Sequence, residues 1–476
     1  MLKTCTFVIA WLGAVAAQAQ DSLWTLQRSV QYAIDNNLDI QQNVLNERLA
    51  RLQLQQSQLS RLPSASVSSN VGRSYGRSID PTTNNFISEG YTFYGLNGNV
   101  DVLLFGWFQR KNTIDQNKLL ARSAAADLDQ IKNDISLNVA TAFLRILLAQ
   151  AQIRVSENQL QFSLKQKEQT EAFVRSGRLP ELDLAQMQAQ VATDSSAYIT
   201  AVATYQQSLL DMKAIMNFDM ATPFVPVAPD VSNIPLAEIA ALEPEQVYTA
   251  AKANFGSVRS GQLRIDAAKK ALTVARGGLY PQLSLGGQFG TNYSSTLREI
   301  TGGQLLGYNA NGQIVYVDGT PLAVQQPNYS YSSRITPFWD QFSNNFRQTV
   351  ALSVLVPLLN GWNARTGVNR ARVDVQSREL ELQQTNLKLR QDVYKAFYDA
   401  KAAIQKYYAT MRAREASDRA YEYAQKRYEL GLMNAVELLT TQNTNFKAQT
   451  DALSAQYDLL FKLKVIDYYL GREIRL

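Results

Sequence analysis

Four short runs of the chain alternate apolar and polar side chains with a period of two. In the first run, Ala65, Val67 and Val71 fall on one face, and serine and asparagine side chains fall on the other. Such alternation is typical of a β-strand with one apolar and one polar face. Each run has about the ten residues that a tilted transmembrane strand needs. The predicted strands are at about 63–76, 96–105, 281–293 and 346–358.

Long helical patterns follow the second and fourth of these strands. Segments 110–176 and 368–430 contain no proline or glycine, and alanine and leucine recur in them every three or four residues. A helix of about 60 residues would be ~90 Å long, and such lengths are typical of coiled coils. A second helical run follows each long one, at 182–216 and 435–470. The pattern therefore predicts two long antiparallel helical hairpins.

A glycine interrupts each hairpin pattern, and its surroundings are repeated. Gly177 is followed six residues later by Asp183 and then by leucine, and Gly431 is followed in the same way by Glu437. The two glycines are 254 positions apart. Glycine readily adopts the left-handed conformation that ends many helices. Gly177 and Gly431 are therefore predicted to form the two hairpin tips.

The chain is two copies of one unit. The helical hairpins repeat at an offset of 254, whereas residues further upstream, such as Pro63 and Pro281, repeat at 218. A helical pattern at 23–61 stops before Pro63, because proline cannot continue a helix. The larger offset predicts an insertion in the second copy, a long polar loop between Tyr293 and Phe346. The expected boundaries are 20–220 for the first repeat, 221–244 for a linker with five prolines, and 245–476 for the second repeat.

Composition excludes several classes of function. The chain has no histidine, which removes the commonest general base and metal ligand. No catalytic motif stands out among the remaining residues, so no enzyme activity, cofactor or metal site is predicted. The net charge of +6 comes without a basic tract, which argues against nucleic acid. Residues 1–19 hold a lysine, a short apolar run with the single cysteine, Cys5, and small residues at the end, as in a secretory signal.

Four strands are too few to close a barrel in a membrane. An open edge leaves amides unpaired in hydrocarbon, at several kcal/mol each, and bacterial barrels have at least about eight strands. Two or three chains would therefore have to share one barrel. Trp107 and Trp362 follow the second and fourth strands at matched positions, where interfacial aromatic side chains are expected. Plain packing between strands and helices is the alternative for both tryptophans.

Two copies of helix–strand–strand–helix–helix resemble TolC-type outer membrane efflux proteins over essentially the whole mature chain. The resemblance rests on the proline-started strands, on "LLFGWFQR" and "LLNGWNAR", and on the tips with glycine, five residues, a carboxylate and leucine. It implies a mixed α and β fold, in which a homotrimer forms a 12-stranded barrel in outer membrane lipid, continued by a helical tunnel in the periplasm. It also implies a non-enzymatic exit duct for an inner-membrane pump and a periplasmic adaptor protein, in efflux or type I secretion.

The resemblance also implies a tunnel entrance at the hairpin tips. In the family, acidic side chains ring this entrance, and tyrosine and arginine contacts hold it shut. By position, Asp183, Glu437 and Tyr428 correspond to these residues. The chain departs from the family at Met433, where a gating arginine can occur, and at Thr440, where a second acidic residue can occur.

Simpler interpretations remain open for the same residues. Asp183 and Glu437 are also suited to the first turn of a helix, where a carboxylate contributes ~0.3–1 kcal/mol through the helix dipole. Tyr428 fits ordinary coiled-coil packing, and Arg178 is the nearest substitute for the missing arginine. For the whole chain, the alternative is a coiled-coil surface stalk or adhesin, which would not need four strands of lipid-spanning length.

Overall fold

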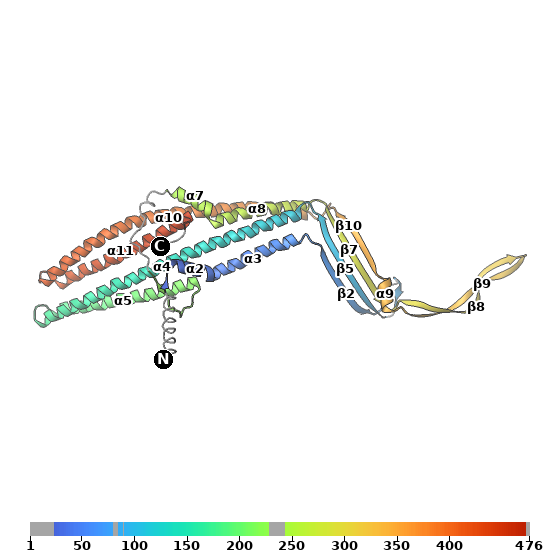
Figure 1. Cartoon of the computed structure of the whole chain (residues 1–476), viewed down its shortest axis with the longest axis horizontal. Helices are drawn as coiled ribbons and strands as arrows, with labels where there is room; N and C mark the ends of the chain where they lie inside the picture. The colour runs from blue at the N-terminus through green and yellow to red at the C-terminus, as the bar shows by residue number, and fades with distance from the viewer. Residues whose placement is uncertain (1–22, 80–83, 89, 228–242, 473–476) are drawn as a thin grey trace, which may run out of the picture. The chain divides into compact units, whose positions relative to one another are not determined.

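The computed structural model describes residues 23–79, 84–88, 90–227 and 243–472 (Figure 1). The described chain divides into two compact units. One is helical and holds residues up to Leu54, 115–269 and those from Arg372 onward; the other holds 55–114 and 270–371. The predicted signal segment 1–19 and most of the predicted linker 221–244 lie outside the described residues.

The first two helices of each copy have the same lengths. Helices α2 (Leu26–Asn36) and α7 (Pro244–Asn254) have 11 residues each. Helices α3 (Leu38–Leu59) and α8 (Gly256–Gly277) have 22 residues each. All four boundaries repeat at an offset of 218, which is the offset found in the upstream sequence.

The boundaries of the hairpin helices also repeat, at the larger offset of 254. Helices α4 (Gln109–Arg175) and α10 (Asn363–Glu429) have 67 residues each. Helices α5 (Glu181–Met216) and α11 (Ala435–Leu470) have 36 residues each. Figure 1 shows each long helix beside the shorter one that follows it. The prediction of two long helical hairpins, as part of the fold class, is confirmed.

A single helix from Leu23 to Arg61, as the sequence pattern indicated, is wrong. The chain breaks at Asn37, whose backbone is extended (φ −64°, ψ 132°). The Asn37 side chain caps α3, because its Oδ1 accepts from the amides of Asp39 (2.9 Å) and Ile40 (3.2 Å). Its Nδ2 donates to the carbonyl of Ile215 at 2.7 Å, which ties the break to the end of α5. The capping side chain of Asn37 therefore divides the segment into two helices, although the apolar periodicity of the sequence continues through it.

The helical unit has its main core near the start of the first copy. The two-residue strand β1 (Leu23–Trp24) pairs in parallel with β6 (Val225–Pro226). The Trp24 ring is 4% exposed and stacks on Phe224 at 5.2 Å between ring centroids. Phe143 from the middle of α4 is fully buried in the same cluster. This core joins the residues around Trp24 to the end of the first hairpin.

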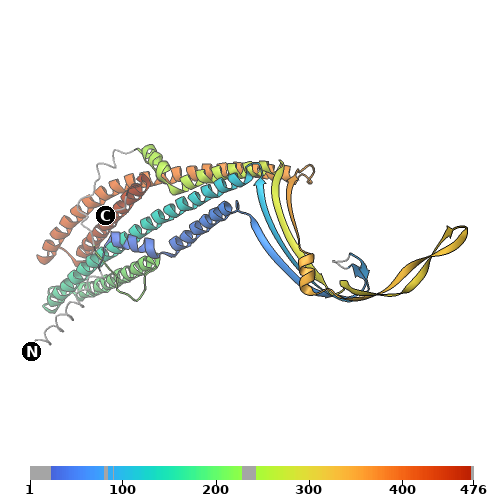
Figure 2. The same cartoon turned by 45° about the vertical axis from the view of Figure 1, so that its right-hand side comes forward.

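The second unit contains one antiparallel sheet with the strand order β10-β7-β5-β2. Its strands are β2 (Ser64–Ser74), β5 (Tyr91–Phe105), β7 (Gln282–Ser294) and β10 (Arg347–Leu355). They lie side by side in both views (Figure 1 and Figure 2). Strand β5 begins at Tyr91 instead of residue 96, and β10 ends at Leu355 instead of residue 358. The four membrane-type strands of the predicted fold class are present.

The register gives the sheet one apolar and one polar face. Val100 of β5 pairs with Ala65 on one side and with Gly287 on the other. The neighbouring Asn99 pairs with Ser66 and with Gln288, so polar side chains line the opposite face. Because successive strand residues point to opposite faces, the alternation in the sequence survives across all four strands.

The insertion of the second copy was predicted as a long polar loop, and this is wrong. It is a β-hairpin of β8 (Arg298–Val317) and β9 (Thr320–Ile335), followed by the short helix α9 (Phe338–Asn344). The turn between the strands is Asp318–Gly319, and both residues have positive φ (47° and 81°). Asp-Gly with positive φ at both positions is the preferred two-residue hairpin turn. The high glycine and asparagine content of the insertion hid this signal.

Helix α8 begins in close contact with α4, and a glycine permits this. A Cβ atom on Gly256 would lie 2.4 Å from the carbonyl oxygen of Ala126 and 2.9 Å from Cβ of Gln130. The Gly256 amide donates to Oε1 of Gln130 at 2.9 Å. Any side chain at position 256 would therefore push α8 away from α4 and weaken this buried hydrogen bond.

We expect Gly256→Ala to lower the free energy of unfolding by about 1–3 kcal/mol, through overpacking and the weakened hydrogen bond. Gly367→Ala is the matched control. Gly367 lies inside α10, and a Cβ atom there would have no other atom within 4 Å, so alanine should stabilise by about 0.5–1 kcal/mol. Urea titration followed by helical circular dichroism measures both. Equal shifts for the two variants would contradict the close-contact explanation.

Candidate functional site: the helical tips

Both hairpin tips close with the same backbone hydrogen bonds. At the first tip, the Arg178 amide donates to the Phe173 carbonyl at 2.9 Å, and the Gly177 amide donates to Val174 at 3.0 Å. At the second, Leu432 and Gly431 donate in the same pattern at 2.8 and 2.9 Å. The glycines have φ of 73° and 72°. This is the Schellman motif, in which a left-handed glycine allows the last carbonyls of a helix to be paired.

The two predicted acidic residues occupy the same position, the third residue of the helix after the tip. In α11, the Asn434 side chain accepts from the Glu437 amide at 2.9 Å and donates to the Glu437 carboxylate at 3.1 Å. In α5, Pro180 precedes the helix without a side-chain cap, and the Asp183 amide donates to its carbonyl at 3.1 Å. Both carboxylates therefore lie where the helix dipole favours negative charge. Glu437 is exposed and Asp183 is half-buried.

Tyr428 lies inside the helical packing near the second tip. It is 7% exposed and belongs to an apolar cluster with Met187 of the first hairpin and Leu438 of the second. Its hydroxyl lies 3.1 Å from Oγ1 of Thr170, which is fully buried on α4. Within one chain, the partner of Tyr428 is therefore Thr170 and not Asp183. The contact ties the two hairpins together close to their tips.

The two departures from the family pattern have local roles. Met433 packs against the apolar cluster around Tyr428. The Thr440 hydroxyl donates to the Val436 carbonyl at 2.8 Å, one turn back along α11. The Arg178 guanidinium lies over the Phe173 ring of its own hairpin, 4.5 Å from the centroid.

A buried carboxylate that the sequence analysis did not single out lies further along the hairpins. Asp194 of α5 is 4% exposed and accepts from Ser163 and Gln159 of α4 and from Gln190 of its own helix. Gln442 of α11 donates to the Ser163 hydroxyl at 3.0 Å. Three helices of two repeats therefore meet at one polar layer. The signal was a lone acidic residue in the otherwise uncharged stretch "QVATDSSAY".

Tyr421 of α10 adds a fourth helix beside this layer. Its ring packs edge-on against Phe162 of α4, with 5.5 Å between centroids. Burial raises the pKa of the Tyr421 phenol, and the nearby Asp194 carboxylate raises that pKa further. The phenol therefore stays neutral at physiological pH. The Asp194 side chain beside it accepts hydrogen bonds from α4 and from its own helix.

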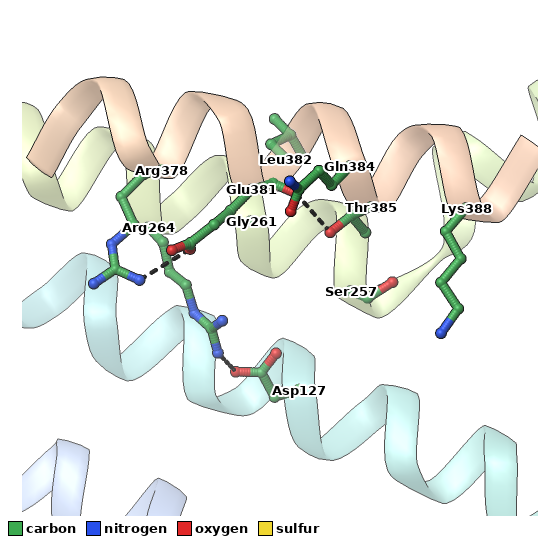
Figure 3. A pocket seen from close by; sticks show the side chains of 10 residues that line it. All are labelled: Asp127, Ser257, Gly261, Arg264, Arg378, Glu381, Leu382, Gln384, Thr385 and Lys388. Carbon is green, nitrogen blue, oxygen red and sulfur yellow. Dashed lines mark hydrogen bonds and ion pairs between the residues drawn. The ribbon is translucent and has the colours of Figure 1, made fainter.

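A charged cleft of about 370 Å³ lies between α4, α8 and α10 (Figure 3). Arg264 of α8 pairs with Asp127 of α4 at 2.7 Å, and Arg378 pairs with Glu381 along α10 at 3.0 Å. Lys388 completes the charged lining. Both carboxylates are thus engaged by arginines. Among the described residues, no group of three or more histidine, cysteine, aspartate and glutamate side chains could hold a metal ion.

The two predicted interface tryptophans lie just before the long helices, but they are not equivalent in the repeat. Helices α4 and α10 begin 254 residues apart, so Trp362 corresponds to Phe108, and Trp107 corresponds to Gly361. All four residues have φ between 47° and 62°. The Trp107 ring lies 4.5 Å from that of Tyr280, whereas Trp362 is 66% exposed. The positive φ region is rare for bulky residues, so this turn is tightly constrained.

We expect Asp194→Ala to destabilise the hairpins near their tips by about 2–4 kcal/mol, because two buried donors, Ser163 and Gln190, and the half-buried Gln159 lose their acceptor. Amide hydrogen exchange along α5 and α11 measures this as a loss of protection. Asp211→Ala on the same helix is the control, since Asp211 is exposed and accepts from the Gln207 side chain at the helix surface. If both variants lose protection equally, the buried layer has no special stabilising role.

Comparison with known proteins relates this arrangement to a family. Residues 29–217 and 247–472 match the family described as outer membrane efflux protein. No sequence relative is found among curated proteins. Similar solved folds include CusC (14% identity, TM-score 0.73, 94% of this chain and 92% of that chain). They also include a membrane protein from Pseudomonas aeruginosa (17%, 0.74, 94% and 90%) and the Campylobacter jejuni CmeC outer membrane channel (15%, 0.71, 94% and 85%). The family match covers both repeats, so the chain belongs to the outer membrane efflux protein family and is an efflux exit duct with its helical part in the periplasm.

Proposed function

We propose that three copies of the chain together form one 12-stranded barrel. The assembled duct catalyses no reaction, and it receives substrates from an inner-membrane pump through a periplasmic adaptor. The main support is the sheet order, in which the outer strands β2 and β10 have a neighbour on one side only within the described residues. In hydrocarbon, each unpaired amide costs several kcal/mol. Pairing of β10 with β2 of the next copy removes both edges.

The number of copies follows from the need for a passage. Two chains would supply eight strands, and the interior of an eight-stranded barrel is just wide enough for side chains to fill it. Three chains supply twelve and leave room for a lumen. The polar face with Ser66, Asn99 and Gln288 suits that lumen. The opposite face suits lipid: Val67 is 68% exposed and Val350 is 77% exposed in the single chain.

The helices supply a second argument, which begins with a contact inside the chain. Helix α4 of the first repeat packs on α8 of the second. We call this contact the α4–α8 seam. Ser123 and Ser260 meet at 2.9 Å between their hydroxyl oxygens, and both are buried. Ala126 is 1% exposed and lies against Gly256.

The two repeat offsets transfer this seam to a contact between chains. An α4 residue corresponds to the α10 residue 254 positions later, and an α8 residue corresponds to the α3 residue 218 positions earlier. Ser123 and Ser260 thus correspond to Ser377 and Gln42, which are both exposed in the single chain. The contacting residues Ala126 and Gly256 correspond to Leu380 and Leu38, which are 59% and 61% exposed. A seam between α10 and α3 of the next copy would bury what the single chain leaves open.

Exposed apolar side chains on both helices recur every seven residues, as in a coiled-coil contact. The exposed side chains are Leu38, Leu45, Leu52 and Leu59 on α3, and Val373, Leu380 and Leu387 on α10. Such stripes are costly in water, where each fully exposed leucine forgoes about 1.5–3 kcal/mol of burial. They favour a repeated contact between identical chains.

A coiled-coil stalk or adhesin is the second candidate function. Seven-residue stripes alone would suit it equally well. A stalk has no use for a sheet with one apolar face of lipid-spanning length, and no adhesive site is apparent in the described residues. The conduit accounts for both the stripes and the sheet.

We also propose that the tip carboxylates select cations at the tunnel entrance. Asp183 and Glu437 occur once each per chain, so three copies would bring six carboxylates to one ring. Like charges around a narrow opening concentrate cations and disfavour anions. Their positions at the start of α5 and α11 leave the charges near the tips. Glu437 also takes part in the capping of α11, so its charge and its hydrogen bond have to be tested separately.

The trimer predicts a specific cross-link. In a Cys5→Ser background, Ser377→Cys combined with Gln42→Cys should form a disulfide between chains under mild oxidation, with covalent dimers and trimers on denaturing gels. Ser377→Cys with Val44→Cys is the control. Two residues along a helix rotate the side chain by about 200°, so this pair should stay uncross-linked. A monomeric mass in detergent with no cross-link in either pair would refute the shared barrel.

The entrance hypothesis predicts a change in ion selectivity. Asp183→Asn with Glu437→Gln removes six charges per trimer while glutamine can keep the hydrogen bond to Asn434. Single-channel reversal potentials should then show a loss of cation preference, and block by multivalent cations from the tip side should weaken. Asp211→Asn with Glu415→Gln removes the same charge away from the tips and should leave both properties unchanged. Unaltered selectivity in the tip variant would reduce both carboxylates to helix-start residues.

A further inference from the structure

Helix α9 packs on the apolar face of the sheet. The ring of Phe338 lies 5.7 Å from Tyr94 of β5 and 5.2 Å from Tyr293 of β7, between centroids. Phe342 lies 6.2 Å from Tyr94. Tyr94 and Tyr293 are an even number of residues from Val100 and Leu283, so they share the face that carries the apolar side chains. The helix therefore covers the lipid-facing side at one end of the strands.

Polar contacts fix α9 to the strand ends and to the base of the β8–β9 hairpin. The fully buried Gln341 accepts from the Ser294 amide and donates to the carbonyls of Ser294 and Thr336, each at 2.9 Å. The Thr291 hydroxyl donates to the Phe342 carbonyl at 2.6 Å. These hydrogen bonds pair polar groups of α9 with residues of the same unit, so they fix the orientation of α9 on the sheet.

The remaining surface of α9 is amphipathic. Trp339 is 74% exposed, although its ring contacts Phe338 at 5.2 Å and Phe342 at 5.8 Å. Asp340 and Ser343 lie on the polar side of the helix, and both are exposed. Tryptophan beside charged and hydroxyl groups is the composition preferred at the boundary between acyl chains and headgroups. In water alone, an exposed indole next to an apolar face would be unfavourable.

A second aromatic pair marks the opposite boundary. The rings of Trp107 and Tyr280 lie 4.5 Å apart between centroids, tilted by 31°, just outside β5 and β7. Tyr293, near the end of β7, lies 13 residues after Tyr280. At about 3.3 Å per residue and a tilt of about 45°, this spans ~30 Å, the thickness of a hydrocarbon core. Helix α9 therefore lies at the height of the outer membrane–water boundary.

We propose that α9 is an interfacial helix whose Trp339 indole enters the headgroup–acyl boundary of the outer leaflet and so holds the base of the β8–β9 hairpin at the membrane surface. The lipid is the occupant because the site continues the apolar face of the strands, on which α9 itself rests. The inference depends on the outer membrane location and not on the number of chains in the barrel. It assigns α9 a role distinct from transport.

Depth-dependent fluorescence quenching tests the proposal. In a Cys5→Ser background, the full-length protein carries Trp339→Cys with an environment-sensitive label and is reconstituted into phosphatidylcholine vesicles that contain nitroxide lipids. We expect at least about twofold stronger quenching by a nitroxide near the headgroup than by one near the chain end, as for a group some 5–10 Å deep. A second label at Ser343→Cys keeps the indole and should show the same preference for the shallow nitroxide.

Two control sites calibrate the measurement. A label at Leu352→Cys, in the middle of β10, should be quenched more by the deep nitroxide, and one at Gly312→Cys, in the β8–β9 hairpin, by aqueous iodide alone. If the labels at 339 and 343 behave like the one at 312, α9 faces water and the proposal is overturned. If neither lipid nor iodide quenches them, a neighbouring chain covers α9, which equally overturns the lipid contact.

Discussion

The need to pair every backbone amide in hydrocarbon governs this molecule. A strand can meet that need only through its neighbours, and the sheet order β10-β7-β5-β2 leaves two strands with one neighbour each within the part of the chain that the structure describes. A soluble sheet can leave its edges to water, but a sheet in lipid has no such solvent. On the proposed trimer, the chain therefore encodes one segment of a barrel that is completed by its copies. The apolar and polar faces of the sheet and the exposed apolar stripes on α3 and α10 all fit that proposal.

Internal duplication relates the α4–α8 seam within the chain to the proposed seam between α10 and α3 of neighbouring copies. The α4–α8 seam lies within the chain and is built from small residues, Ser123, Ala126, Gly256 and Ser260. Its counterpart on α10 and α3 carries Ser377, Leu380, Leu38 and Gln42, with larger side chains at most of the same positions. The two seams are thus related in geometry and different in chemistry. In the proposed trimer, such a difference would keep the two contacts from competing, because small and large surfaces do not pack interchangeably.

Polar groups buried between the long helices give the hairpins a defined register. Helices of 67 and 36 residues present many similar apolar positions along their lengths, so apolar packing by itself is a weak determinant of register. Ser163 donates to Asp194 and accepts from Gln442, and the Tyr428 hydroxyl meets that of Thr170, so a shift of register would break these hydrogen bonds. A single buried polar position is known to specify register in coiled coils at some cost in stability. Here these positions also join the two repeats near the tips.

The sequence by itself determined the repeat, the four strands, the helical hairpins and the family, because each depends on local periodicity that tertiary packing preserves. It also located the tip glycines, since Gly177 and Gly431 end helices through backbone conformation alone. It misjudged the hairpin of β8 and β9, where the Asp318–Gly319 turn was masked by polar composition. It also paired Trp107 with Trp362, although the helix boundaries pair Phe108 with Trp362. Only the tertiary structure decided that Tyr428 bonds Thr170, that Asp194 is buried and that α9 rests on the apolar face. Those facts depend on which residues meet across distances of 31 to 258 positions in the chain, and local periodicity carries no information about contacts that are set by the packing of whole helices.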